Sequence, residues 1–154
     1  MYHAADVALA ARDLVRADQR LAALLTQFPD SALLDQALYE RARIAYQRRA
    51  WADAQRQLDR LAALPASPLA EPGAYLACRI AFEAGDGSAE TCLAHYLARY
   101  PRSSHDLDVR GLLAELAFRA GGCAAARSRA AELVERYPDA ALARGWRHRC
   151  LEPR

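Results

Sequence analysis

The stretch CRIAFEAGDGSAETCLAHYLARYP, residues 78–101, holds the pattern that decides the fold. An apolar segment that ends near Phe82 is followed by Gly85-Asp86-Gly87, and a Leu- and Ala-rich segment then runs to Tyr100-Pro101. Glycine ends helices readily because it adopts the left-handed conformation at little cost. Proline cannot continue a helix because it lacks the backbone N–H. The stretch therefore predicts a helix, a short turn, a second helix and a proline-marked turn.

The same pattern recurs along the chain with a constant period. The segments Ala42–Tyr46, Cys78–Phe82 and Ala114–Phe118 are 36 residues apart. Four prolines that follow an apolar or aromatic residue have separations of 36, 36 and 37: Pro29, Pro65, Pro101 and Pro138. A period in this range is typical of a helical solenoid, in which each helical hairpin buries its apolar stripe against its neighbours.

The composition supports an all-α protein and excludes several other classes. Of 154 residues, 37 are Ala and 22 are Leu, whereas the β-branched residues that sheets need are scarce. With 53% hydrophobic residues, the chain is not expected to be disordered. All 21 basic residues are Arg, but the net charge is only +2, so no nucleic-acid partner is expected. No apolar run is long enough to predict a transmembrane segment or a signal peptide.

We expect one domain over residues 1–154, a right-handed α-solenoid of about four hairpins with a capping helix. The expected repeats are 1–30, 31–66, 67–102 and 103–138, followed by the capping helix 139–150. The expected helices are 3–12, 15–28, 31–48, 52–64, 70–84, 88–99, 105–120, 123–136 and 139–150. The first two have no Gly or Pro between them, and one long helix is the alternative there.

The core is expected to contain large apolar residues at helical spacing, with small residues where neighbouring helices approach closely. The large residues are Leu21, Leu25, Leu38, Ile44, Leu58, Leu61, Ile80, Leu93, Leu97, Leu113, Leu116, Leu133 and Val134. The small residues are Ala42, Ala45, Ala81, Ala114 and Ala117.

Several of these features together resemble the tetratricopeptide repeat (TPR) family. Its small residue in helix A is matched by Ala42, Cys78 and Ala114, and the aromatic residue that follows by Tyr46, Phe82 and Phe118. Its turn is matched by Gly85-Asp86, Gly121 and Trp51, and its small residue in helix B by Ala17, Ala54, Ala89 and Ala126. The chain departs from the family in its longer period, in Arg41 at an apolar position, and in Gly87 and Cys123 at the turn aromatic.

The linkers Phe28-Pro29-Asp30-Ser31 and Tyr100-Pro101-Arg102-Ser103 look most like those of bacterial cell-envelope TPR proteins of the CpoB and BamD type. The resemblance implies a non-enzymatic scaffold that binds a protein or peptide partner. The alternative is a regulatory or signal-transduction domain cut from a larger chain. The protein would be periplasmic or envelope-associated if exported, and otherwise cytoplasmic. The sequence names neither the partner nor the oligomeric state.

The resemblance also implies that helix-A residues line a binding groove. Carried over by position, these residues are Tyr39, Arg43, Tyr46, Gln47, Tyr75, Arg79, Phe82, Glu115, Phe118 and Arg119. Arg beside aromatic residues is common in protein-binding hot spots, and Arg43 with Arg79 would form a basic strip for an acidic peptide. The alternative is that the three late aromatics fill the core between repeats and the two arginines are merely solvated.

The four cysteines allow two interpretations. If the protein is exported, the natural disulfides are Cys78–Cys92 and Cys123–Cys150; otherwise the cysteines act as small apolar residues. No cofactor is expected, and no metal site, because the zinc-binding spacings are missing. Ser103-Ser104-His105-Asp106 has the letters of a catalytic triad, but adjacent residues at a helix start cannot form one. The basic segment Arg144–Arg149 fits the polar face of a capping helix better than a nucleic-acid or lipid contact.

Overall fold

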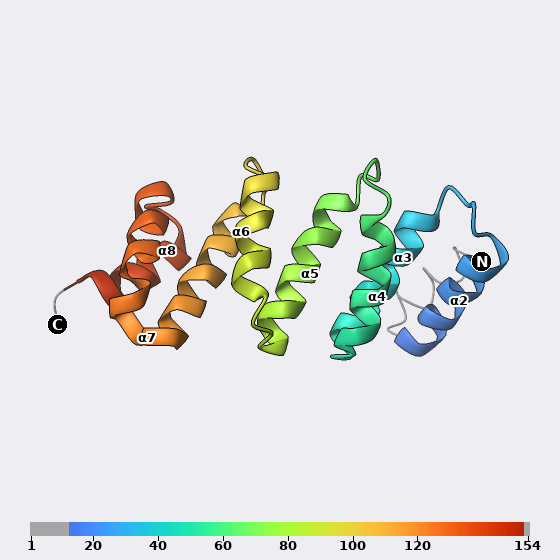
Figure 1. Cartoon of the computed structure of the whole chain (residues 1–154), viewed down its shortest axis with the longest axis horizontal. Coiled ribbons are helices and arrows are strands. Elements are labelled where there is room, and N and C mark those ends of the chain that lie inside the picture. The colour runs from blue at the N-terminus through green and yellow to red at the C-terminus, as the bar shows by residue number, and fades with distance from the viewer. Residues whose placement is uncertain (1–12, 153–154) are drawn as a thin grey trace. The chain divides into compact units, whose positions relative to one another are not determined.

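The computed structural model describes residues 13–152, and every regular element in that range is a helix (Figure 1). This finding confirms the predicted all-helical class. The chain divides into two compact units, residues 1–84 and 85–154, which are described separately. The single-domain organisation stays a prediction, and the helix expected at 3–12 lies outside the described residues.

The described part of the first unit contains four helices that pack in the order in which they occur along the chain. They are α2 (Leu14–Gln27), α3 (Leu34–Gln47), α4 (Trp51–Ala62) and α5 (Ala70–Ala84). Each packs against the next, as the hairpin pattern predicts. On α4, for example, Ala54, Leu58 and Leu61 follow the helical period and are all buried.

The second unit contains α6 (Ala89–Arg99), α7 (Asp106–Arg136) and α8 (Ala141–Trp146), followed by a π-helical segment, η1 (Arg147–Leu151). Helix α7 is in fact two helices, because Gly121 and Gly122 leave the helical conformation, with φ of −158° and +62°. The kink lies where the sequence predicts a turn. The single capping helix expected at 139–150 is instead the short α8 and η1.

A serine turn joins three of the four Pro-marked linkers to the following helix. In each turn the serine side chain accepts a hydrogen bond from the backbone N–H two residues later, which holds the chain outside the helix. The helix expected from residue 31 therefore begins at Leu34. The three bonds are Leu33 N to Ser31 Oγ at 3.2 Å, Leu69 N to Ser67 Oγ at 3.0 Å, and His105 N to Ser103 Oγ at 2.9 Å.

Small side chains occupy the buried positions that repeat from hairpin to hairpin. Those in helix A are Ala42, Cys78 and Ala114, and those in helix B are Ala17, Ala54, Ala89 and Ala126; none is more than 2% exposed. Most of the predicted large core residues are also buried. Leu97, Leu116 and Val134 are half-buried. The repeated small residues therefore mark where helices pack against each other, and do not merely reflect the high helix propensity of Ala.

A bulky residue at one of these small positions should destabilise the fold. Ala54→Leu adds three carbon atoms where no surface is exposed, so we expect the free energy of unfolding to fall by about 1–3 kcal/mol. Ala52→Leu, on the exposed side of the same helix, is the matched control and should change it by less than about 0.5 kcal/mol. Urea denaturation of both variants measures the difference. Equal effects would show that position 54 does not limit helix packing.

Candidate functional site

Helix α3 carries the first part of the predicted groove. Tyr39, Arg43 and Tyr46 are spaced by four and three residues, which places them on one face of α3. The Arg43 guanidinium lies 6.0 Å from the centre of the Tyr39 ring. It also donates to both carboxylate oxygens of Glu40, at 3.0 and 3.2 Å. About half of the Arg43 side chain, 49%, remains exposed.

Helix α5 repeats this arrangement and adds a network that reaches back to α3. The Arg79 guanidinium lies 6.0 Å from the centre of the Tyr75 ring and donates to the Tyr75 hydroxyl at 3.1 Å. It also donates to Glu83 Oε1 at 3.0 Å and to the Tyr46 hydroxyl at 3.5 Å. Tyr46 in turn donates its hydroxyl proton to Glu83. The network therefore joins α3 to α5 through side chains 33 and 37 residues apart.

These contacts set the charge of the network. Burial works against the charged forms of Arg79 and Glu83, but their mutual hydrogen bond and those to Tyr75 and Tyr46 outweigh it. The pKa of Arg79 is therefore raised and that of Glu83 is lowered. Both groups stay ionised at neutral pH. We call Tyr39, Arg43, Tyr46, Tyr75 and Arg79 the tyrosine–arginine face.

Of the predicted groove residues in the first unit, the structure brings three into contact and buries Phe82. Arg79 contacts both Tyr75 and Tyr46. Phe82 is only 8% exposed, so little of its ring is accessible to a partner. Sequence reasoning missed Glu40 and Glu83, which oppose the charges of the two arginines. The signal was present, because an acidic residue three or four positions from an Arg on a helix predicts an ion pair.

In the second unit, the C-terminal segment contacts the predicted groove residues. The Arg149 guanidinium lies 3.6 Å from the centre of the Phe118 ring and 4.9 Å from that of Trp146. It also donates to Glu115 at 2.9 Å, and Arg119 pairs with the same carboxylate at 3.4 Å. Trp146 is buried and meets Phe118 edge-on at 6.0 Å. The basic C-terminal segment therefore packs back on α7.

A disulfide also holds this C-terminal segment. Cys123 of α7 and Cys150 of η1 are bonded, with their Cα atoms 5.0 Å apart. Cys78 lies in the first unit and Cys92 in the second, so their pairing stays a prediction. In the described part of the chain, no group of three Cys, His, Asp or Glu side chains could hold a metal ion.

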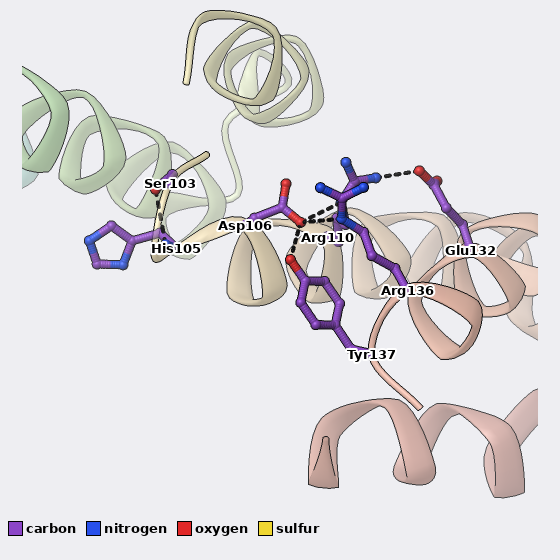
Figure 2. Close-up of polar contacts among 7 residues, drawn as sticks. All are labelled: Ser103, His105, Asp106, Arg110, Glu132, Arg136 and Tyr137. Atoms are coloured by element: carbon purple, nitrogen blue, oxygen red, sulfur yellow. Dashed lines mark hydrogen bonds and ion pairs between the residues drawn. The ribbon is translucent and has the colours of Figure 1, made fainter. Parts of the chain in front are cut away.

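Among the described residues of the second unit, the most buried charged side chain is Asp106, at the start of α7 (Figure 2). The Asp106 side chain is 4% exposed, and its Oδ2 atom accepts three hydrogen bonds. The donors are Arg110 Nε at 2.8 Å, Arg136 Nε at 3.1 Å and the Tyr137 hydroxyl at 2.5 Å. Arg110 also pairs with Glu132. This cluster ties both halves of α7 and the Tyr137-Pro138 linker to one carboxylate.

The position of Asp106 shows what the Ser103-Ser104-His105-Asp106 segment does. Ser103 forms the serine turn, while Asp106 points toward Arg110, Arg136 and Tyr137 (Figure 2). Burial alone would raise the pKa of Asp106, but the hydrogen bonds from Arg110 and Tyr137 and the charges of Arg110 and Arg136 lower it. The carboxylate is therefore a structural anion, and sequence reasoning did not find its partners.

Comparison with known proteins identifies the family of the chain. The family model described as YfiO, outer membrane lipoprotein, matches residues 1–152. No curated protein matches the chain. Among the described residues, no helix combines the length and the apolar character that crossing a membrane requires.

The Tyr137 hydroxyl should stabilise the second unit. Tyr137→Phe removes its bond to a buried carboxylate, and we expect it to reduce the free energy of unfolding by about 1.5–3 kcal/mol. Tyr100→Phe is the matched control, because Tyr100 precedes Pro101 in the same way and its hydroxyl bonds to none of the described residues. Thermal or urea unfolding compares the two variants. Equal losses would contradict the role of the Asp106 bond.

The contribution of Asp106 should depend on pH. A carboxylate whose pKa is lower in the folded state stabilises the fold above its unfolded value, about 3.9, and this contribution is lost as the pH falls through the folded pKa. We expect Asp106→Asn to reduce the free energy of unfolding by about 2 kcal/mol at neutral pH. The difference should narrow below about pH 4. Urea denaturation from pH 7 to pH 3 measures it, and a difference independent of pH would refute the assignment.

Proposed function

Because the chain belongs to the YfiO outer membrane lipoprotein family, we propose that it is a non-enzymatic scaffold that binds a protein or peptide partner in cell-envelope assembly. We place the binding site on the tyrosine–arginine face of the first unit. Membership of this family favours the envelope role over a regulatory domain cut from a larger chain.

The observation that supports this site most strongly is the network between α3 and α5. Tyr46, Arg79 and Tyr75 are held by hydrogen bonds before any partner arrives. A face that is already ordered loses less side-chain entropy on binding than one whose side chains are mobile. Tyrosine and arginine are also the residue types that contribute most to hot spots in protein interfaces.

The exposure of Arg43 also supports a binding site on this face. Arg43 is half exposed beside Tyr39, and both lie on the same helix face as Tyr46. A guanidinium that lies over a ring presents both a flat apolar surface and hydrogen-bond donors to a partner. In the second unit, by contrast, Arg149 already lies over Phe118. We therefore assign the partner to the first unit and not to Glu115, Phe118 and Arg119.

Photocross-linking in cells that express the full-length protein tests the site. With p-benzoylphenylalanine in place of Arg43, we expect a covalent adduct with a protein partner, which mass spectrometry identifies. Arg56 is the matched control position, because it is exposed on α4 and pairs with an acidic residue three positions away, as Arg43 does. The same adduct from both positions, or an adduct from position 56 alone, would contradict the proposal.

Affinity for the cross-linked partner gives a quantitative test. Arg43→Ala should weaken binding by about tenfold, which corresponds to about 1.4 kcal/mol, whereas Arg56→Ala should leave it unchanged. Isothermal titration calorimetry with purified proteins measures both. Circular dichroism checks that the two variants keep the helical content of the parent chain.

A further inference from the structure

The turn between α3 and α4 contains a residue in an unfavourable backbone conformation. Arg49 has a φ of +56°, and it is the only non-glycine residue with positive φ in the described part of the chain. The corresponding turns use Gly85 and Gly122, with φ of +70° and +62°. The left-handed region is costly for a residue with a Cβ atom, because that atom crowds the backbone. A glycine at position 49 would therefore suit the turn better.

The Arg49 side chain does not contribute the hydrogen bonds that close this turn. The closing bonds are made by backbone atoms, from Arg49 N to the Tyr46 carbonyl and from Ala50 N to the Ala45 carbonyl, both at 2.9 Å. Within residues 13–152, neither the Arg48 nor the Arg49 guanidinium makes a hydrogen bond or an ion pair. Both residues are exposed. A strained conformation that folding does not require is a feature of functional sites.

The surroundings of the turn show what kind of site this is. Tyr46 lies on one side of it and Trp51 on the other, with their ring centres 5.6 Å apart. Glu83 lies close enough for the charge of Arg49 to help lower the pKa of its carboxyl, yet that carboxylate already accepts bonds from Tyr46 and Arg79. The turn thus carries two exposed arginines between a tyrosine and a tryptophan along the chain, and these residue types are common in protein-binding hot spots.

We propose that Arg48 and Arg49 bind an acidic segment of a protein partner, beside the tyrosine–arginine face. This inference rests on the proposed function and names the chemistry of the partner. Arg43 and Arg79 pair with Glu40 and Glu83, whereas Arg48 and Arg49 of the turn form no ion pair with any of the described acidic residues. Guanidinium groups bind carboxylates through paired hydrogen bonds.

The charge balance favours an acidic protein segment over an anionic membrane surface. Residues 13–84 contain nine arginines and nine acidic residues, so the described part of the unit has no excess positive charge to draw it to a membrane. The attraction is local to the turn. A short run of carboxylates matches it in both size and sign.

Substitutions of Arg49 in the whole chain separate the charge from the strain. Arg49→Gly removes both, Arg49→Ala removes the charge and keeps the Cβ atom, and Arg49→Lys keeps both. We expect Arg49→Gly to raise the Tm by about 2 °C, and the other two variants to melt close to the parent. A lower Tm for Arg49→Gly would contradict the inference that glycine at position 49 makes the fold more stable than arginine does.

Fluorescence anisotropy with a labelled glutamate-rich peptide measures binding, and the same peptide with glutamine in place of glutamate is the control. We expect the parent and Arg49→Lys to prefer the glutamate peptide, and Arg49→Ala and Arg49→Gly to bind it about tenfold more weakly. Arg56→Ala, which removes an exposed arginine elsewhere in the unit, should bind as the parent does. Unchanged binding by Arg49→Ala would overturn the inference.

Two further outcomes separate the alternatives. If vesicles containing phosphatidylglycerol, and not the glutamate peptide, bind in a manner that requires Arg49, the acidic-protein assignment is wrong. If position 43 gives no specific adduct while Arg49 still governs binding of the glutamate peptide, the tyrosine–arginine face fails and the turn site stands. If position 43 gives the adduct and Arg49→Ala binds the peptide normally, the turn site fails and the proposed function stands.

Discussion

The close approach of neighbouring helices at small buried side chains is the constraint on which both units depend. Ala17, Ala42, Ala54, Cys78, Ala89, Ala114 and Ala126 are at most 2% exposed. Each lies where a larger residue would push two helices apart. This spacing brings the helix-A side chains of successive repeats within reach of each other. The polar networks, and the face that we assign to the partner, are consequences of that approach.

The same kind of contact appears in both units with different chemistry. In the first unit, the aromatic residue late in α3, Tyr46, is met by Arg79 of α5. In the second unit, the corresponding Phe118 of α7 is met by Arg149 of η1. In both units, the same arrangement of helices brings an arginine from a later segment to the aromatic residue of an earlier helix. What differs is the part of the ring that the arginine contacts: Arg79 donates to the Tyr46 hydroxyl, whereas Arg149, in a segment bonded to α7 by the Cys123–Cys150 disulfide, lies over the Phe118 ring.

The sequence was enough to predict the helical class and the repeat, because small residues and prolines recur at fixed spacing and each has one structural role. It did not predict the polar partners. The residue after each aromatic is Gln47, Glu83 and Arg119 in turn, so this position has no repeating chemistry. Ion pairs such as that of Arg149 with Glu115 also depend on helix rotation and rotamers, which periodicity does not encode. The only sign of the strained turn in the sequence is that Arg49 stands three residues after Tyr46, where the turns after Phe82 and Phe118 have a glycine.

Mapping of amide chemical shifts tests the central claim most directly, which is that the partner binds the first unit on the side of the tyrosine–arginine face. The isotope-labelled chain is titrated with the protein that cross-links to position 43. We expect the largest shifts in α3, in the α3–α4 turn and in α5, at Tyr39, Arg49 and Tyr75 above all. Shifts that gather on the exposed side of α4, around Arg56 and Arg60, would contradict it.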